Sequence, residues 1–256
     1  MSQEYCSPSA RAHGKDEPCG CGSDAVIGHA MKCFDIWFVG LAMVTVALKS
    51  TAAETGIPLV DIKSVDPTIV IELRYGGSNN LTGHRLYPLG TPALVRSELA
   101  WRLVTAQAFL KRYEYRLKIW DAYRPKSVQV QLWQAVHNND YVADPGAGAG
   151  SLHNWGVAVD VTLVDTWNRA VPMPTDFDDF TPAAMCHYRG ADPWIRWHLH
   201  LLQIAMGHAG FYRLRTEWWH FTIAEWQKYL PREEAERAMQ ALEPGGRANY
   251  DQPNTN

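Results

Sequence analysis

The segment SLHNWGVAVDVTLV, residues 151–164, gives the strongest indication of how this chain folds. Its second part, residues 156–164, alternates and is rich in valine, which is the pattern of a strand in a packed sheet. Asp160 lies in the middle of this apolar strand, where a buried carboxylate without a partner would cost several kcal/mol. We therefore expect a compensating group close to Asp160.

His153, seven residues before Asp160, is a candidate for the same site. A continuous strand would place the two side chains on opposite faces, because seven is an odd interval. The intervening Asn154, Trp155 and Gly156 permit a bend that brings them together. A divalent cation would then compensate Asp160 and take His153 as a ligand. An aspartate that caps a turn or pairs with an arginine is the alternative for this segment alone.

EWWHF, residues 217–221, supplies a second acid and histidine, Glu217 and His220. The two tryptophans between them would form a dry wall, which raises the basicity of a carboxylate and strengthens nearby charge interactions. Ligands from His153, Asp160 and His220 would leave a fourth tetrahedral position for water, as a catalytic zinc requires. Glu217 would then take the proton of that water. The same spacing of Glu and His also occurs in ordinary ion-paired loops, so that alternative stays open on the residues alone.

The flanking segments predict the rest of a single domain. They indicate strands at 65–75, 116–125 and 217–223, helices at 92–113, about 128–136, 194–205 and from 224, and a flexible glycine loop at 144–151. Strands and helices mingle without a regular βαβ repeat. This order favours an α+β fold with a largely antiparallel sheet flanked by helices.

The first 53 residues differ from the rest and predict a leader. Residues 34–48 are apolar apart from Asp35, Gly40 and Thr45, and the run has the length of a signal-peptide core. Small residues at 50–53 offer a cleavage site, so we expect export to the periplasm. Met31 would be a natural start codon for such a leader, in which case residues 1–30 would be an over-extension of the coding sequence. A single N-terminal anchor or a buried helix is the alternative.

We expect the domain to cover residues 54–243 and a disordered tail to cover 244–256. Four of the five cysteines lie in or before the leader, so cleavage would leave only Cys186 and no intramolecular disulfide. The net charge is −3, from 24 basic and 27 acidic residues, without blocks of like charge. We therefore expect no nucleic-acid partner and no stable membrane partner after leader removal. The sequence leaves the oligomeric state open.

Four segments together resemble a known family. RYGGSNNLTG (74–83), WDAYRP (120–125), SLHNWGVAVDVTL (151–163) and EWWHF (217–221) are similar to segments of the VanX-type D-alanyl-D-alanine dipeptidases. These belong to the wider D-Ala-D-Ala peptidase group, which shares its fold with the hedgehog signalling domain. The segments follow the family's order and span nearly the whole predicted domain, so their combination is specific where one motif would not be.

The resemblance implies a catalytic role for five residues. His153, Asp160 and His220 fall on the ligands of one zinc ion per chain, and Glu217 falls on the general base and acid. Arg124 matches an arginine that stabilises the negative oxygen of the tetrahedral intermediate. A salt bridge from Arg124 to a nearby aspartate is the structural alternative, and it is compatible with that role because a paired arginine is a positioned arginine.

The resemblance also implies residues that face the substrate. Tyr75, Asp121 and Ser151 match positions near the substrate, and Asp178 in DFDDF matches an acid that receives the substrate ammonium, with Asp179 as the alternative. Two departures bear on the pocket: the stretch from 124 to 151 is shorter than in the family, and Trp155 stands where a polar or basic residue is expected.

The activity implied is zinc-dependent hydrolysis of the small D-Ala-D-Ala dipeptide. A carboxypeptidase of the same fold that trims peptidoglycan stems is one alternative, and an exported enzyme would meet such stems directly. A non-catalytic zinc-bearing binding module is another. Such a module would need neither Glu217 nor Arg124, and the sequence contains both.

Overall fold

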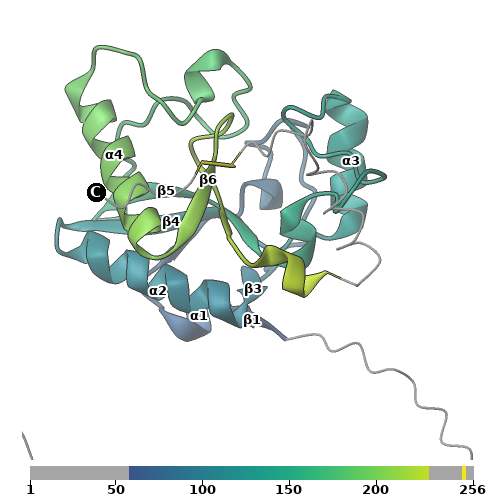
Figure 1. Ribbon diagram of the computed structural model, residues 1–256, viewed down its shortest axis with the longest axis horizontal. Helices are drawn as coiled ribbons and strands as arrows, with labels where there is room; N and C mark the ends of the chain where they lie inside the picture. The colour runs from purple at the N-terminus through teal and green to yellow at the C-terminus, as the bar shows by residue number, and fades with distance from the viewer. Residues whose placement is uncertain (1–57, 231–249, 252–256) are drawn as a thin grey trace, which may run out of the picture. The chain divides into compact units, whose positions relative to one another are not determined.

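The computed structural model of the chain describes residues 58–230 and 250–251 (Figure 1). The predicted leader and most of the predicted tail lie outside these residues, so their prediction stays open. Among the described residues no helix is long and apolar enough to cross a bilayer.

One six-stranded sheet organises the described residues. Its strands are β2 (Val70–Ile71), β4 (Tyr115–Asp121), β5 (Ala158–Asp165), β7 (His220–Ile223), β6 (Phe211–Leu214) and β8 (Tyr250–Asp251), in that spatial order. The β2–β4 pair is parallel and every other neighbouring pair is antiparallel. A separate two-stranded sheet joins β1 (Leu59–Asp61) and β3 (Leu94–Arg96). The predicted α+β class with a largely antiparallel sheet is confirmed.

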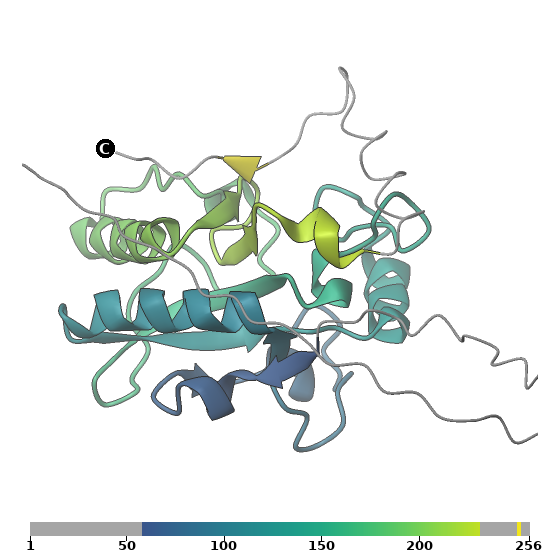
Figure 2. The same cartoon turned by 60° about the horizontal axis from the view of Figure 1, so that its bottom comes forward.

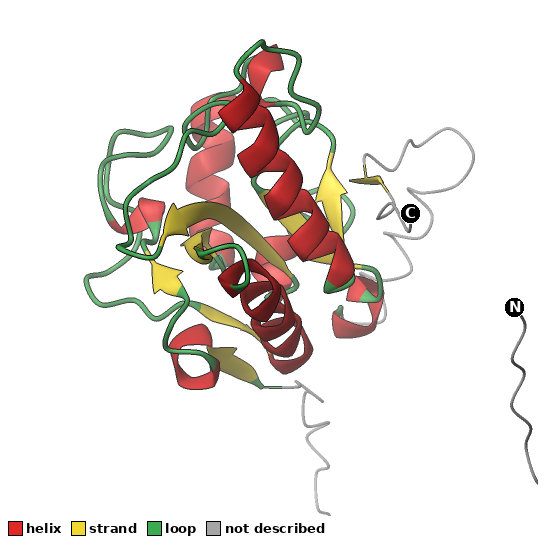
Figure 3. Ribbon diagram, turned by 90° about the vertical axis from the view of Figure 1, so that its left-hand side faces the viewer, coloured by secondary structure: helices red, strands yellow, loops and turns green. Residues whose placement is uncertain are grey.

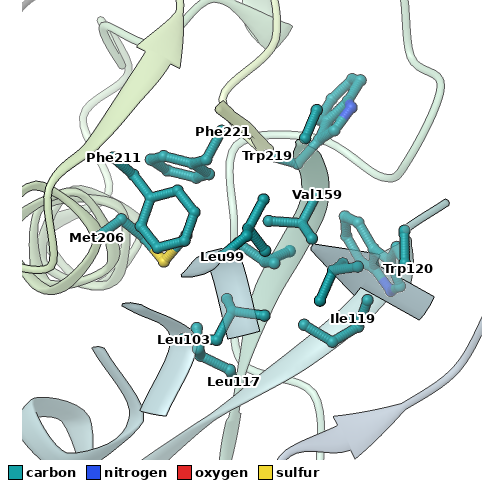
Figure 4. Close-up of a cluster of buried hydrophobic side chains, with 14 of the residues drawn as sticks. Leu99, Leu103, Leu117, Ile119, Trp120, Val159, Met206, Phe211, Trp219 and Phe221 are labelled. Atoms are coloured by element: carbon teal, nitrogen blue, oxygen red, sulfur yellow. The ribbon is translucent and has the colours of Figure 1, made fainter. Parts of the chain in front are cut away.

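The part of the chain that the structure describes contains four α-helices: α1 (Ile62–Val65), α2 (Ser97–Lys111), α3 (Lys126–Val136) and α4 (Pro193–His208). The two long helices, α2 and α4, pack against each other, and Figures 2 and 3 show α2 running along the sheet with α4 beside it. Leu99 and Leu103 of α2 meet Leu117, Ile119 and Val159 of the sheet in the buried core (Figure 4). This face of β5 is therefore covered by helices.

Alternation along β5 places the other set of side chains on the opposite face. Asp160 points away from the helix-covered face that carries Val159, and it lies opposite His220 of β7 by register. The bend at β4, where register shifts between Ile119 and Asp121, also brings Asp121 opposite Asp160. The sheet thus carries a polar cluster on the face that the two long helices leave uncovered.

Three predicted elements have different bounds in the structure. The strand expected at 65–75 is limited to Val70–Ile71, after which the chain turns into the 3₁₀ helix Arg74–Gly76. The helix expected from Pro92 begins at Ser97, because Leu94–Arg96 pairs with Leu59–Asp61 instead. The last strand begins at His220 and not at Glu217. In each case a pairing between distant segments, which local pattern does not contain, decides the boundary.

The predicted bounds of α3 and α4 were closer to those in the structure. The helix expected at 128–136 is α3, and the helix expected at 194–205 is α4, although Trp194 is 63% exposed and belongs to no buried stripe. Tyr250 and Asp251, in the predicted disordered tail, form β8 against the open edge of β6. Pairing satisfies backbone groups that an edge strand leaves unbonded. Of the terminal helix expected from 224, the described residues contain one 3₁₀ turn, Trp226–Tyr229.

Glu98 ties that 3₁₀ turn to α2. Its carboxylate accepts hydrogen bonds from the Lys228 ammonium, from the Tyr229 hydroxyl at 2.7 Å and from Arg102 at 2.9 Å. These hydrogen bonds, that of Lys228 first, lower the pKa of Glu98 to about 2. The turn is therefore held on α2 by a charged group.

We expect Glu98→Gln to lower Tm at pH 7. A carboxylate with a depressed pKa stabilises the fold above its unfolded pKa, near 4.5, and that stabilisation is lost as pH falls toward 2. Because the Glu98 side chain is 30% exposed, this stabilisation is of order 1 kcal/mol. In a domain of this size, its loss corresponds to a decrease in Tm of roughly 2–4 °C.

Circular dichroism melts of both proteins between pH 7 and pH 3 test this, and the gap in Tm should narrow as pH falls. Glu225→Gln is the control, because Glu225 makes a single contact to Arg102 and is 51% exposed. A gap that stayed constant across this pH range would contradict the assignment.

Candidate active site

His153, Asp160 and His220 converge on one point in the structure. One ligand atom of each lies within 4.8 Å of the others, and all three side chains are buried. His153 Nε2 is 3.3 Å from Asp160 Oδ1, and His220 Nδ1 is 3.0 Å from the same oxygen. The structure therefore brings together the three residues that the sequence predicted as metal ligands.

The predicted bend between His153 and Asp160 is present. Residues Leu152–Trp155 form a 3₁₀ turn, which Ser151 caps by accepting a hydrogen bond from the backbone N–H of His153 at 3.3 Å. Gly156 then adopts a left-handed conformation with φ of 69°, and a Cβ at this position would also collide with the Leu59 side chain. The turn reverses the side-chain direction, so His153 and Asp160 meet despite their odd spacing.

The chemistry of this donor set suits zinc. His153 Nδ1 donates to the backbone carbonyl of Ala122 at 2.8 Å, which leaves the lone pair of Nε2 directed at the cluster. Burial alone would raise the pKa of Asp160, but the nearby His153 and His220 overcome this and hold that pKa well below its usual range. Two imidazoles and an ionised carboxylate are the donors of a catalytic zinc site, which keeps one position open.

Glu217 lies beside the cluster of His153, Asp160 and His220 but is not one of the three clustered residues. Its Oε2 is 3.9 Å from His220 Nδ1, and Trp218 and Trp219 are both buried, as the dry wall predicted from the sequence requires. Burial, followed by the charges of Asp160 and Asp178, raises the pKa of Glu217 well above its usual value. Glu217 is thus a carboxylate with a strengthened affinity for protons.

Arg124 is fixed from several sides. Its Nε and Nη2 donate to Asp121 Oδ2 at 2.9 and 2.7 Å, and its Nη1 donates to Gln129 Oε1 at 2.8 Å. The guanidinium lies over the Tyr75 ring, 5.0 Å from the centroid, and Nη2 is 3.7 Å from Asp160 Oδ2. The predicted salt bridge is present, and it holds a cation next to the metal ligands.

Asp121, which the sequence predicted near the substrate, lies against Arg124. Its side chain is fully buried and is not among the residues that line the cavity. Its carboxylate accepts from the Tyr87 hydroxyl at 2.6 Å as well as from Arg124. Asp121 therefore lies behind Arg124, because two buried donors hold its carboxylate there.

The structure distinguishes the two candidate acids of DFDDF. Asp178 lines the cavity, and its carboxylate accepts from the Tyr75 hydroxyl at 3.2 Å and from the Leu81 backbone N–H at 2.9 Å. Burial raises the pKa of Asp178 to about 7. Asp179 instead accepts from the backbone N–H of Thr181 at 3.1 Å, which is a local turn.

The three clustered residues all line one cavity of about 700 Å³, as do Glu217, Arg124 and Asp178. Its lining also includes Tyr75 and Phe180, and Leu214 and Trp226. Ser151 also lines it, as the sequence predicted.

Two buried residues that support Arg124 escaped the sequence analysis, Tyr87 and Gln129. Both are nearly or fully buried polar side chains, and each touches Arg124 or its partner Asp121. Gln129 lies on the buried stripe of α3 beside Val128 and Leu132, where no local signal separates it from a solvent-facing glutamine.

Comparison with known proteins shows the family to which the chain belongs. The family described as D-Ala-D-Ala dipeptidase, Peptidase_M15, matches residues 55–237. The D-alanyl-D-alanine dipeptidase of Escherichia coli (strain K12) is 31% identical over 171 residues, which cover 67% of this chain and 87% of that protein. The D-alanyl-D-alanine dipeptidase of Enterococcus faecium is 25% identical over 173 residues, which cover 60% and 85%.

A crystal structure of the vancomycin-resistance D,D-pentapeptidase VanY in complex with Zn(II) aligns with a TM-score of 0.35 and 14% identity, over 60% of this chain and 82% of that one. The family match covers most of the chain and includes the segments 74–83, 120–125, 151–163 and 217–221. The chain therefore belongs to the D-Ala-D-Ala dipeptidase family, Peptidase_M15, and is a zinc metallopeptidase.

Proposed function

We propose that this enzyme hydrolyses the D-Ala-D-Ala dipeptide, with one Zn²⁺ held by His153, Asp160 and His220. The observation that carries the proposal is the convergence of this triad with Glu217 and Arg124 in one cavity. A non-catalytic zinc module would need the triad alone. The presence of a proton acceptor and a fixed cation beside the triad favours catalysis.

Glu217 is the proton carrier in this proposal. When bound, zinc lowers the pKa of a coordinated water to about 7 and polarises the scissile carbonyl. Glu217 takes the proton of the attacking water and later delivers it to the leaving amine, because its raised pKa allows it to hold a proton between the two steps. Trp218 and Trp219 keep bulk water from competing for that proton.

Arg124 stabilises the negative charge that develops on the carbonyl oxygen. Asp121 and Gln129 hold the guanidinium before the substrate arrives, so little reorganisation is needed during the reaction. Positive charge at this place also offsets the carboxylate of Asp160, which lies 3.7 Å away.

Asp178 receives the substrate ammonium in this proposal. It is the half-buried acid of the cavity beside Tyr75, and a cation next to it favours its ionised form despite the pKa of about 7. A substrate whose amino group is blocked would leave Asp178 without its partner, which disfavours acylated peptides.

The volume of the cavity supports a second candidate. About 700 Å³ is typical of a site for a drug-sized ligand and exceeds the needs of a dipeptide. A carboxypeptidase that trims peptidoglycan stems is therefore the alternative function. Export, which we propose from the apolar residues 34–48, would bring the enzyme to such stems.

We expect Glu217→Gln to keep zinc and to lower kcat at least 100-fold, since general acid–base catalysis contributes roughly 10²–10⁴. His220→Ala should lose zinc, because a ligand is removed. Elemental analysis and kcat on D-Ala-D-Ala measure both effects. His198→Ala is the control, since His198 is a buried histidine whose ring bonds Pro172 and Tyr115 far from the triad. Equal loss of zinc from Glu217→Gln and His220→Ala would contradict the assignment of Glu217 as a general base that does not bind the metal.

We expect Gln129→Met to lower kcat roughly 10-fold with little change in KM. This decrease in kcat is smaller than the roughly 10²- to 10³-fold decrease expected when a donor to an oxyanion is removed. The reason is that Arg124 loses an acceptor that fixes its orientation. Gln129→Glu keeps that acceptor and should retain more of kcat.

Gln107→Met is the matched control for this variant. Gln107 is also fully buried, and it bonds the Leu117 backbone N–H at 2.8 Å and the Thr68 hydroxyl at 3.0 Å, away from the cavity. Both Met variants should lower Tm, whereas Gln129→Met alone should lower kcat. Equal kcat in the two would make Gln129 a purely structural residue.

We expect Asp178→Asn to raise KM for D-Ala-D-Ala roughly 10- to 100-fold, because a charged hydrogen bond to the ammonium is lost. The same variant should also lower the preference for the free dipeptide over its N-acetylated form, measured as the ratio of the two kcat/KM values. Asp179→Asn is the control and should keep the wild-type ratio. A wild-type ratio near one would refute the dipeptidase reading and favour the carboxypeptidase.

A further inference from the structure

Two aromatic side chains from distant loops meet at the cavity. Tyr141, in the loop after α3, stacks on Phe180, with ring centroids 4.7 Å apart and planes inclined by 22°. Both side chains line the cavity and both are half-buried, so the stack lies at its rim. Phe180 follows Asp178 by two residues, which places the stack at the end of the cavity that holds this acid.

Each ring belongs to a segment that is anchored separately. On the Tyr141 side, Gln129 Nε2 donates to the Ala143 carbonyl at 2.6 Å, which ties the loop to α3 and to Arg124. On the Phe180 side, Asp178 has a left-handed conformation with φ of 59°, and its carboxylate accepts from the Leu81 backbone N–H. The stack therefore bridges two loops that the rest of the fold already positions.

We propose that Tyr141 and Phe180 form a latch across the amino end of the cavity and set the length of peptide that the enzyme accepts. This proposal rests on the proposed function, in which Asp178 receives the substrate ammonium. A peptide that continues beyond that nitrogen would run into the stacked rings, whereas a free dipeptide ends there.

The lining of the cavity extends beyond the two stacked rings. Leu214 of β6 and Trp226 also line it, and among the described residues neither of them is stacked on Tyr141 or Phe180. In this proposal, that part of the cavity accommodates the carboxyl-terminal residue of a substrate and does not relieve the contact at the amino end. The latch thus reconciles a cavity of about 700 Å³ with selection for a short substrate.

The test compares two substrates that both lack a free ammonium next to the scissile residue, N-acetyl-D-Ala-D-Ala and a pentapeptide stem that ends in D-Ala-D-Ala. Because neither substrate offers an ammonium to Asp178, the ratio of their kcat/KM values reports the effect of peptide length and not that of the charge on Asp178. We expect Phe180→Ala and Tyr141→Ala each to raise the ratio of stem to acetylated dipeptide roughly 10-fold, because a steric block is removed.

Phe180→Tyr preserves the stack and should keep the wild-type ratio. Phe109→Ala is the control, because Phe109 of α2 pairs with Tyr113 just after that helix, with ring centroids 5.4 Å apart, and does not line the cavity. Melting curves for each variant show that it folds, and two independent alanine variants keep the test decisive if one of them does not.

Each outcome separates the two proposals. Hydrolysis of D-Ala-D-Ala by every folded variant, with a stem-to-acetyl ratio unchanged in both alanine variants, would overturn the latch and leave the proposed function standing. Absence of hydrolysis of all three substrates by the zinc-loaded wild type would overturn the proposed function and the latch together.

Discussion

A carboxylate buried in the middle of a valine-rich strand governs how the active site of this protein is assembled. Asp160 is 2% exposed in β5, and the strand pairings place Asp121 and His220 directly beside it. Such a charge is tolerated only where other charges and donors compensate it. His153 and Arg124 reach it from outside the sheet, so the active site is assembled around the group that most needs partners.

The compensation extends into a continuous chain of buried hydrogen bonds. Tyr87 donates to Asp121, Asp121 accepts from Arg124, Arg124 donates to Gln129, and Gln129 donates to the carbonyl of Ala143. A buried polar network stabilises a fold only when its members are satisfied. This chain also runs from β4 through α3 into a wall of the cavity, so the orientation of the Arg124 guanidinium and the shape of the cavity are coupled.

The site divides its tasks between rigid and variable parts of the fold. The proposed metal ligands come from the sheet and from a 3₁₀ turn locked by Gly156, where packing limits their movement. The residues that we propose to select the substrate, Asp178, Phe180 and Tyr141, lie on loops that line the cavity. Loops tolerate change better than core strands, so specificity in this architecture can vary while the chemistry is preserved.

Local patterns determined β5, α3 and α4 from the sequence, because strand alternation and helical period depend only on neighbours in the chain. The motifs around residues 153 and 217 likewise pointed to the residues that the site brings together. Tertiary structure alone decided that Ser97 starts α2, that Asp121 lies behind Arg124, and that Asp178 and not Asp179 faces the cavity. Each of these depends on a pairing or a hydrogen bond between segments far apart in the chain, and such contacts leave no periodic trace in the sequence.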